Sequence, residues 1–313
     1  MLLSIIIPTY NRSISLINNL KNLENCIIKE DICDDVEIIV SDNDSDDKEK
    51  NIIKSYVPND KCNVLIHFQN HNIGFEDNML FLLDKSTGKY TMTMGDDDFI
   101  DYELFNTIIS YIKKDEFRSI VCNFYNVNEK GEKISDYRDP IRDDLIYLTQ
   151  DFRLASLGHQ MSCLIFLTDG LYDAYKNYCK KTLYPQVFFV GYSMIFGKGV
   201  HITRFPYKNT VLDKKNFNYD FDNLLDEICV AYDCIPIENK KERIKYLKYF
   251  VKCERDRFIG KNTFFKPIRF IKKVKNDYDI SDTFKRIILN YYIIENVKLP
   301  FKYLFFLMKG KGK

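Results

Sequence analysis

The sequence predicts an α/β protein with a mostly parallel sheet flanked by helices. Strand-like apolar runs alternate with helical patterns from residue 2 to about 115, and a polar segment follows three of these runs directly. Alternation of this kind favours right-handed βαβ units. Because parallel strands end at the same edge of a sheet, we expect the polar segments 8–12, 41–47 and 95–98 to converge there.

The individual elements follow from the spacing of apolar residues. Continuous apolar runs predict strands buried on both faces, and apolar residues three or four apart predict helices. Pro8 should end the first strand and Ser13 should cap the first helix. The predicted strands are 2–7, 36–40, 64–68 and 89–95, and the predicted helices run over 13–27, through 52–53 and 79–83, and over 102–114.

The remainder of the chain is less regular and predicts a second, helical region. Further strands are expected at 118–127, 163–167 and 201–205, with a charged loop at 128–144, and helical periodicity returns at 221–235 and 238–258. We therefore expect one α/β domain over 1–215, made of the halves 1–115 and 116–215, and a helical, basic region over 216–313.

Composition narrows the class of protein. The 313 residues include 24 Phe and 22 Tyr, enough apolar material for a large core. Nine cysteines without a CxxC pair and four histidines without zinc-ligand spacing argue against a disulfide framework and a structural zinc, so a reducing cytoplasm is expected. The apolar run at the N-terminus is too short for a signal peptide, and no segment approaches the roughly 20 apolar residues of a membrane span.

Three consecutive aspartates, Asp96, Asp97 and Asp98, follow the fourth strand. Carboxylates this close repel one another unless a cation or solvent relieves them. Oxygen ligands of this kind suit Mg²⁺ or Mn²⁺, which usually share their coordination shell with substrate phosphates. The same residues could instead form a solvated turn that favours the start of the following helix.

Four ordered motifs carry a resemblance to a known family. SIIIPTYNR, EIIVSDNDSDD, NIGFEDN and GKYTMTMGDDDFI occur in this order within residues 1–115. In order and spacing they resemble the nucleotide-sugar half of family 2 glycosyltransferases of the GT-A fold. The GDDD ending, with SDN at the second strand, looks most like the branch that builds bacterial O-antigen and capsule polysaccharides, including abequosyltransferase-like members. The resemblance implies that 1–115 binds the donor and that 116–215 binds the acceptor.

The resemblance also implies roles for individual residues. Asp42 would accept a hydrogen bond from the nucleotide base, although it could equally form a local turn or helix cap. Asp98 would hold Mn²⁺ or Mg²⁺, and Asp96 or Asp97 would contact ribose or sugar. The remaining positions that match the donor pocket are Pro8, Thr9 and Tyr10 along base and ribose, with Tyr10 alternatively a core aromatic, and Asn72 and Asn78.

The resemblance does not identify the residue that acts as the catalytic base in this chain. Its members invert the anomeric centre with a base from a Glu-Asp pair, which would fall near 185–188, where this chain has PQVF. His159 is the substitute we expect, because imidazole titrates near working pH. A structural hydrogen-bonding histidine is the alternative reading, and Asp169 and Gln186 are weaker candidates, Gln186 only for orienting the acceptor.

The sequence therefore predicts a metal-dependent inverting glycosyltransferase. It would move a sugar from a nucleotide-sugar donor, expected to be a UDP-sugar, to a hydroxyl of a surface-polysaccharide acceptor, which we expect to be lipid-linked. A nucleotidyltransferase is an alternative, but PTYNR lacks the glycines of a phosphate loop. A noncatalytic glycan-binding or scaffold relative is another, because the Glu-Asp pair is absent.

The charge distribution bears on partners. Residues 240–313 contain 21 Lys and Arg against 7 Asp and Glu, interleaved with apolar residues. Such a segment could lie on anionic lipid at the inner face of the cell membrane, or it could be a solvated helical face packed on protein. Nucleic acid is not expected as a partner, because the first 239 residues are acidic and contain no nucleic-acid motif.

Overall fold

The computed structural model describes residues 1–211, 221–258 and 267–309. It divides into two compact units, Met1–Asn218 and Tyr219–Lys313. The expected domain boundary near residue 215 lies outside the described residues. Each unit is described below by itself.

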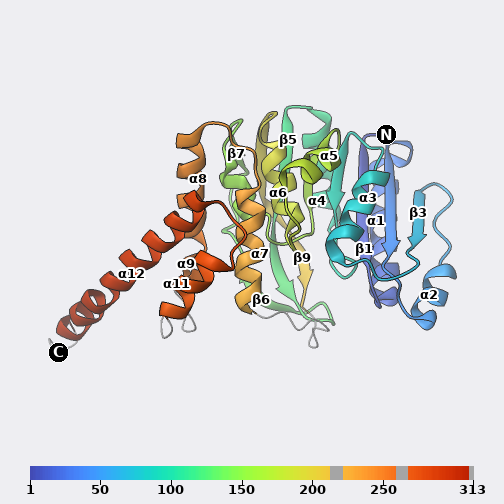
Figure 1. The fold of residues 1–313 in the computed structure, drawn as a ribbon. Coiled ribbons are helices and arrows are strands. Elements are labelled where there is room, and N and C mark those ends of the chain that lie inside the picture. Colours follow the sequence, from blue (N-terminus) through green and yellow to red (C-terminus); the bar gives the residue numbers. More distant parts are fainter. Residues whose placement is uncertain (212–220, 259–266, 310–313) are drawn as a thin grey trace. The chain divides into compact units, whose positions relative to one another are not determined.

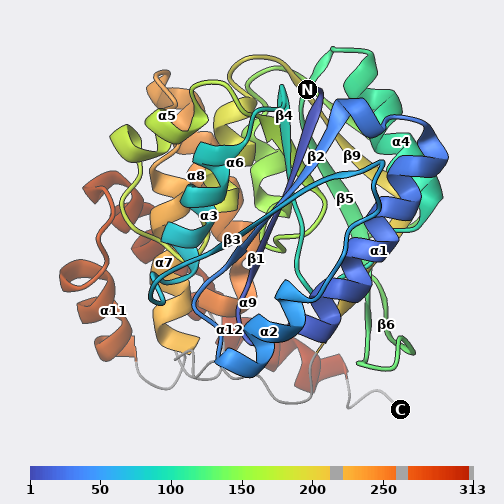
Figure 2. The same ribbon diagram turned by 90° about the vertical axis from the view of Figure 1, so that its right-hand side faces the viewer.

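A mixed sheet forms the centre of the first unit (Figures 1 and 2). Its strand order is β3-β2-β1-β4-β8-β5-β9-β7, with β6 paired to β5. The strands are β1 (Leu3–Thr9), β2 (Val36–Asp42), β3 (Asn63–Phe68), β4 (Tyr90–Thr93), β5 (Phe117–Val127), β6 (Lys133–Tyr137), β7 (Leu145–Tyr147), β8 (Leu164–Leu167) and β9 (Lys198–Thr210).

The first four strands pair in parallel, as their alternation with helices requires. Strand β8 runs antiparallel between β4 and β5, and β9 returns parallel to β5. The predicted α/β class with a large, mostly parallel sheet is confirmed. The parallel pairing brings the carboxyl ends of β1, β2 and β4 to one edge, where the predicted polar segments begin.

Helices cover both faces of this sheet. Figure 2 shows α1 and α4 on one face and α3, α5 and α6 on the other. The helices are α1 (Ser13–Glu30), α2 (Asp47–Lys54), α3 (Phe75–Lys85), α4 (Tyr102–Lys113), α5 (Leu171–Tyr178) and α6 (Pro185–Ser193), with short 3₁₀ turns η1 (Cys33–Asp35) and η2 (Phe152–Leu157). Leu20, Leu23 and Ile27 of α1 are buried in the main hydrophobic core, which explains why their helical spacing could be recognised in the sequence.

Two predicted features at the start of the chain are wrong. Pro8 does not end β1, which continues to Thr9 and pairs Pro8 with Ser41 of β2. Pairing with β4 stops at Ile6, so a proline is tolerated where the strand is bonded on one side. Ser13 is not a cap residue: it begins α1, and its backbone N–H donates to Glu49 Oε2 at 2.8 Å.

Two further boundaries differ from the prediction. Strand β4 ends at Thr93 rather than Gly95, because the Gly95 backbone bonds to side chains: its N–H donates to Ser162 Oγ at 2.8 Å and its carbonyl accepts from Asn19 at 2.6 Å. The stretch 128–144 is not wholly irregular, since β6 within it pairs with β5. The short strand KISDY has few apolar residues, so the sequence did not indicate it.

The second unit is helical in its described part. It comprises α7 (Phe221–Asp233), α8 (Lys240–Cys253), α9 (Arg255–Phe258), α11 (Pro267–Asn276) and α12 (Asp282–Lys309). Tyr232 stacks on Phe250 with ring centroids 3.7 Å apart, and both are buried. Among the described helices, none is sufficiently long and apolar to cross a bilayer.

Candidate functional site

The ends of β1 and β2 place Thr9 beside Asp42 at the edge of the sheet. The Asn43 backbone N–H donates to the Thr9 carbonyl at 2.9 Å, which extends this pairing into the loop. The Thr9 hydroxyl donates in turn to Asp96 Oδ2 at 2.7 Å. The first and third polar segments are therefore joined directly, and Asp42 lies next to the residue that joins them.

Asp42 is completely buried and makes local hydrogen bonds. The Ser45 backbone N–H donates to its Oδ2 at 3.1 Å, and the Ser45 hydroxyl donates to its Oδ1. The Asn11 N–H donates to the same Ser45 hydroxyl at 2.7 Å. These hydrogen bonds form the local turn that the sequence analysis gave as an alternative role for Asp42. They also fix the carboxylate between the first two polar segments.

Arg12 forms ion pairs with two of the three aspartates. Its Nη1 lies 3.1 Å from Asp96 Oδ1 and 3.0 Å from Asp97 Oδ2. Burial opposes the charge on Arg12, but the two carboxylates outweigh it and raise the pKa of the guanidinium. Burial raises the pKa of Asp96 to about 6, while Arg12 acts in the opposite direction.

Asp98 is held by a different set of donors. The Thr210 backbone N–H donates to its Oδ1 at 2.7 Å, and the Ser162 hydroxyl donates to its Oδ2. Burial and the neighbouring Asp97 raise the pKa of Asp98 to about 7, against the effect of these two hydrogen bonds. Asp98 is only 6% exposed, so its charge is not relieved by bulk solvent.

The side-chain oxygens close to Gly95 test whether the residues here suit a divalent cation. A Cβ atom at this position would lie 3.0 Å from Asp98 Oδ2, 3.1 Å from Ser162 Oγ and 3.4 Å from Asp97 Oδ1. The three nearest atoms are thus oxygens, the ligands that Mg²⁺ and Mn²⁺ prefer. Within the described residues, no three acidic, histidine or cysteine side chains already form a complete ligand set. Asp97 and Asp98 fit a cation that takes its other ligands from a substrate or water.

The other residues predicted for the donor pocket differ in their exposure and in their hydrogen bonds. Pro8 is buried in β1, whereas Tyr10 is 38% exposed and is therefore not a core aromatic. Asn72 is exposed, and its Oδ1 accepts from Asn43 Nδ2 at 3.1 Å. Asn78 is buried and both ends of its amide bond to Ser41, at 2.6 and 3.1 Å. These two bonds fasten α3 to β2.

His159 and Gln186 lie together on the segments that precede β8 and begin α6. Gln186 Nε2 donates to the His159 carbonyl at 3.1 Å, and the His159 ring is edge-on to Tyr184 at 6.4 Å. Gln186 is 3% exposed, and its Oε1 has no hydrogen-bond partner among the described residues. Ser162 follows three residues after His159 and contacts Asp98, so this segment reaches the aspartates. Asp169 is exposed beyond the far end of β8.

Three residues of the site were not identified from the sequence. The sequence analysis placed Arg12 in a polar loop and gave it no role. A basic residue in a segment expected to share the sheet edge with three aspartates could have identified it. Ser162 and Thr210 come from strand regions more than 60 residues beyond Asp98, and no local pattern links them to it.

Comparison with known proteins agrees with this geometry. The family described as Glycosyl transferase family 2 matches residues 4–189. A GalNAc(5)-diNAcBac-PP-undecaprenol beta-1,3-glucosyltransferase from Campylobacter jejuni is 33% identical over 96 residues, 31% of this chain and 29% of that protein. The match therefore spans less than a third of that curated relative.

Solved structures are similar over most of the chain. S. aureus TarS 1-349 in complex with UDP-GlcNAc has a TM-score of 0.66 at 16% identity, over 95% of this chain and 89% of that one. The mannosyltransferase PcManGT from Pyrobaculum calidifontis, in complex with GDP-Man and Mn²⁺, has a TM-score of 0.56 at 12% identity, over 95% and 86%. At these identities the likeness establishes the fold. With the family match over more than half of its length, the chain belongs to glycosyl transferase family 2 and has the GT-A fold.

Proposed function

We propose that the chain transfers a sugar from a nucleotide-sugar donor to a hydroxyl of a surface glycan, with residues 1–115 binding the donor and 116–215 the acceptor. One observation carries the proposal: Thr9 and Arg12 hold Asp96, while Ser162 and Thr210 hold Asp98 separately. Two buried carboxylates are thus fixed at the strand edge where α/β folds bind ligands. A helix cap would need neither the burial nor the second set of donors.

The donor would lie along the ends of β1 and β2. Asp42 would accept a hydrogen bond from the base, and the exposed ring of Tyr10 would lie along base and ribose. The TarS neighbour is named with UDP-GlcNAc and UDP, and the mannosyltransferase with GDP-Man. We favour a UDP-sugar because the TarS structure has the higher TM-score of the two.

Asp98, with Asp97, would hold Mn²⁺ or Mg²⁺ through the carboxylate oxygens that lie close to Gly95. When bound, such an ion stabilises negative charge on the departing nucleoside diphosphate. The residues of the chain then have three tasks. Arg12 offsets the negative charges of Asp96 and Asp97, Ser162 orients Asp98, and Asp96 contacts ribose or sugar.

Transfer with inversion requires a base for the acceptor hydroxyl. His159 is half-buried three residues before Ser162, and the hydrogen bond from Gln186 fixes its backbone. We assign His159 this role and Gln186 the role of a positioning residue. Because PQVF at the start of α6 contains no acid, the imidazole of His159 takes the role that an acid has in the family.

The acceptor would be a lipid-linked oligosaccharide of O-antigen or capsule type, and the abequosyltransferase-like branch is part of this proposal. The Campylobacter relative is named for an undecaprenol-linked substrate. Helix α11 supports peripheral contact with a membrane at the cytoplasmic face. Its Phe270 and Val274 are buried, whereas Ile268 is 72% exposed beside the exposed Lys272 and Lys275. A basic helix with an exposed aliphatic residue suits an anionic lipid surface.

The decisive experiment measures release of nucleoside diphosphate from UDP- and GDP-sugars with and without Mn²⁺. We expect release from a UDP-sugar that needs the metal and falls at least about 100-fold in Asp98→Asn. Asp84→Asn, an exposed carboxylate on α3, is the matched control. Release of pyrophosphate, or equal activity in the two variants, would overturn the proposal.

A further inference from the structure

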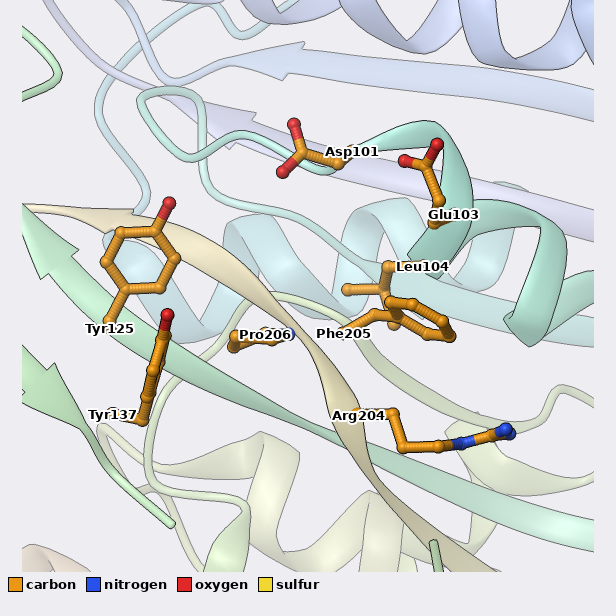
Figure 3. A pocket seen from close by; sticks show the side chains of 8 residues that line it. All are labelled: Asp101, Glu103, Leu104, Tyr125, Tyr137, Arg204, Phe205 and Pro206. Atoms are coloured by element: carbon orange, nitrogen blue, oxygen red, sulfur yellow. The ribbon is translucent and has the colours of Figure 1, made fainter. Parts of the chain in front are cut away.

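A pocket with a volume of about 210 Å³ lies on the first unit and is lined by residues other than the three aspartates. Figure 3 shows Tyr125 and Tyr137 on one side of it, with their phenol oxygens toward Asp101. Phe205 lies on the other side and Pro206 between them. Glu103, at the start of α4, completes the acidic wall. None of these residues belongs to the donor site described above.

An irregularity in β9 creates this pocket. Cys122 pairs with Ile202, but Phe124 pairs with Tyr207, so β5 advances by two residues while β9 advances by five. The additional residues turn out of the ladder and bring Phe205 and Pro206 to the rim. Bulges of this kind re-aim side chains and recur beside functional sites.

Buried polar groups hold the bulge in place. Thr203 is completely buried, its N–H donates to Asp144 Oδ1 at 3.0 Å, and its hydroxyl donates to the Arg142 carbonyl at 2.6 Å. Arg204 bonds to Asp144 Oδ2, at 2.8 Å from Nη2, and points away from the pocket centre (Figure 3). The pocket is therefore formed before any ligand arrives, which lowers the cost of binding.

The walls combine aromatic rings with hydrogen-bond acceptors. Tyr125 and Tyr137 are edge-on to each other with centroids 5.4 Å apart, and Tyr137 is 42% exposed. Asp101 and Glu103 are exposed and offer carboxylate oxygens. A sugar ring has apolar C–H faces and hydroxyl donors at its edge, so a pocket lined by both aromatic rings and carboxylates matches both.

Charge distinguishes a neutral ligand from an ionic one. The Lys208 ammonium lies 3.0 Å from Asp101 Oδ1, and the Lys133 ammonium lies 3.8 Å from the centre of the Tyr137 ring. With Arg204 paired to Asp144, the cations in and around the pocket offset its carboxylates. A charged ligand would therefore gain little electrostatic stabilisation here. Hydroxyl groups, in contrast, can donate hydrogen bonds to the carboxylates and accept them from the ammonium groups.

We infer that this pocket binds one neutral saccharide unit of the acceptor glycan, at a distance from the unit that receives the new sugar; the inference rests on the proposed function. The strand that forms the pocket also supports the aspartates. Phe99 and Lys208 exchange two backbone hydrogen bonds, at 3.0 and 2.9 Å, and Thr210 bonds to Asp98. A glycan held here would run alongside the segment that contains Asp98.

Ligand-observed saturation-transfer NMR on the full chain tests this inference, with the methyl glycosides of glucose, galactose, N-acetylglucosamine and N-acetylgalactosamine as probes. We expect at least one glycoside to give a signal that persists in excess UDP and Mn²⁺. That signal should fall at least about fivefold in Tyr137→Ala and in Glu103→Gln. Tyr178→Ala, at a tyrosine that is 56% exposed and outside the pocket, should leave it unchanged.

Three outcomes would overturn the inference: no glycoside gives a signal, UDP with Mn²⁺ abolishes it, or Glu103→Gln and Tyr137→Ala behave like Tyr178→Ala. Glu103→Gln keeps the test valid if Tyr137→Ala fails to fold. Donor hydrolysis measured on the same samples separates the two proposals. Hydrolysis without glycoside binding would contradict only the inference about the pocket. Glycoside binding without hydrolysis would contradict only the proposed catalytic function.

Discussion

Arg12 Nη1 lies between Asp96 and Asp97, 3.1 Å from one carboxylate and 3.0 Å from the other. The first polar segment therefore supplies positive charge to the third. Asp98 receives hydrogen bonds from Ser162 and Thr210 but forms no ion pair within the described residues. This asymmetry leaves Asp98 as the carboxylate with the most to gain from an added cation.

Replacing Arg12 by Gln should destabilise the protein by about 1 to 3 kcal/mol, because two largely buried carboxylates lose their charged partner. The loss should be larger at pH 8 than at pH 5, where protonation of the acids makes the partner unnecessary. Urea unfolding at both pH values measures it. Arg153→Gln, whose ion pair with Asp151 is on the surface, is the control and should cost less than about 1 kcal/mol. Equal costs for the two variants would contradict the prediction.

The pH dependence of stability follows from the same carboxylates. The pKa values of Asp96 and Asp98 are raised to about 6 and about 7, from an ordinary value of 3.8. A raised carboxyl pKa contributes stability at low pH, and that stability is lost as pH rises through the folded-state value. The metal-free protein should therefore lose stability between pH 5 and pH 8, and Asp98→Asn should lose less.

Thermal shift with Mn²⁺ and UDP completes this test. Because protons and the cation compete for Asp98, stabilisation by the ligands should be greater at pH 8 than at pH 5 by about 2 to 5 °C. Mn²⁺ should have little effect on Asp98→Asn at either pH. The same shift at both pH values would show that Asp98 does not bind the cation.

Ser162→Ala should move the pH profile of donor hydrolysis upward. The Ser162 hydroxyl bonds to Asp98 and lowers the pKa of that carboxyl, so its removal should raise the pH of half-maximal activity by about one unit at low Mn²⁺. Ser162→Thr keeps the hydroxyl and should restore the profile. Ser193→Ala, at a buried serine without a partner among the described residues, controls for packing. An unchanged profile in Ser162→Ala would refute the role.

The sequence predicted those parts of the fold that depend on local spacing. Leu20, Leu23 and Ile27 recur at helical spacing and are buried in the core, so their pattern alone identified α1. Strand ends were predicted less well where side chains replaced backbone partners. Gly95 leaves the sheet because Asn19 and Ser162 take its backbone hydrogen bonds, and neither residue is close to it in the sequence.

The site was predictable to the extent that parallel strands share an edge. This rule places Asp42 and Asp96 at the same edge, and Thr9 connects their segments. It does not say which cation balances the negative charge of the aspartates. Arg12 supplies part of the positive charge that a metal ion was expected to supply. The bulge that opens the pocket beside Phe205 was not predicted, because the sequence indicated a strand only over 201–205. Only the pairing of β9 with β5 shows the additional residues.

Membrane association through α11 predicts binding to vesicles that contain anionic phosphatidylglycerol, and weaker binding to neutral phosphatidylcholine. Replacing Lys272 and Lys275 by Glu should weaken co-sedimentation with anionic vesicles about tenfold or more, since each basic residue near the surface contributes about 1 kcal/mol. Lys48→Glu, on exposed α2 of the first unit, is the charge control. Binding that is unchanged in the double variant would remove α11 from the membrane proposal.

His159 should affect the rate of transfer rather than donor binding. His159→Gln should lower the transfer rate by about 10² to 10⁴, the range typical of lost general-base catalysis, and should change how the transfer rate depends on pH. Stabilisation by UDP and Mn²⁺ should stay as in the native chain, because the aspartates and their donors are unchanged. His71→Gln, at an exposed histidine, is the control. If His159→Gln instead weakens UDP binding and leaves the pH profile intact, the residue supports the Ser162 segment structurally, and the base must be sought elsewhere.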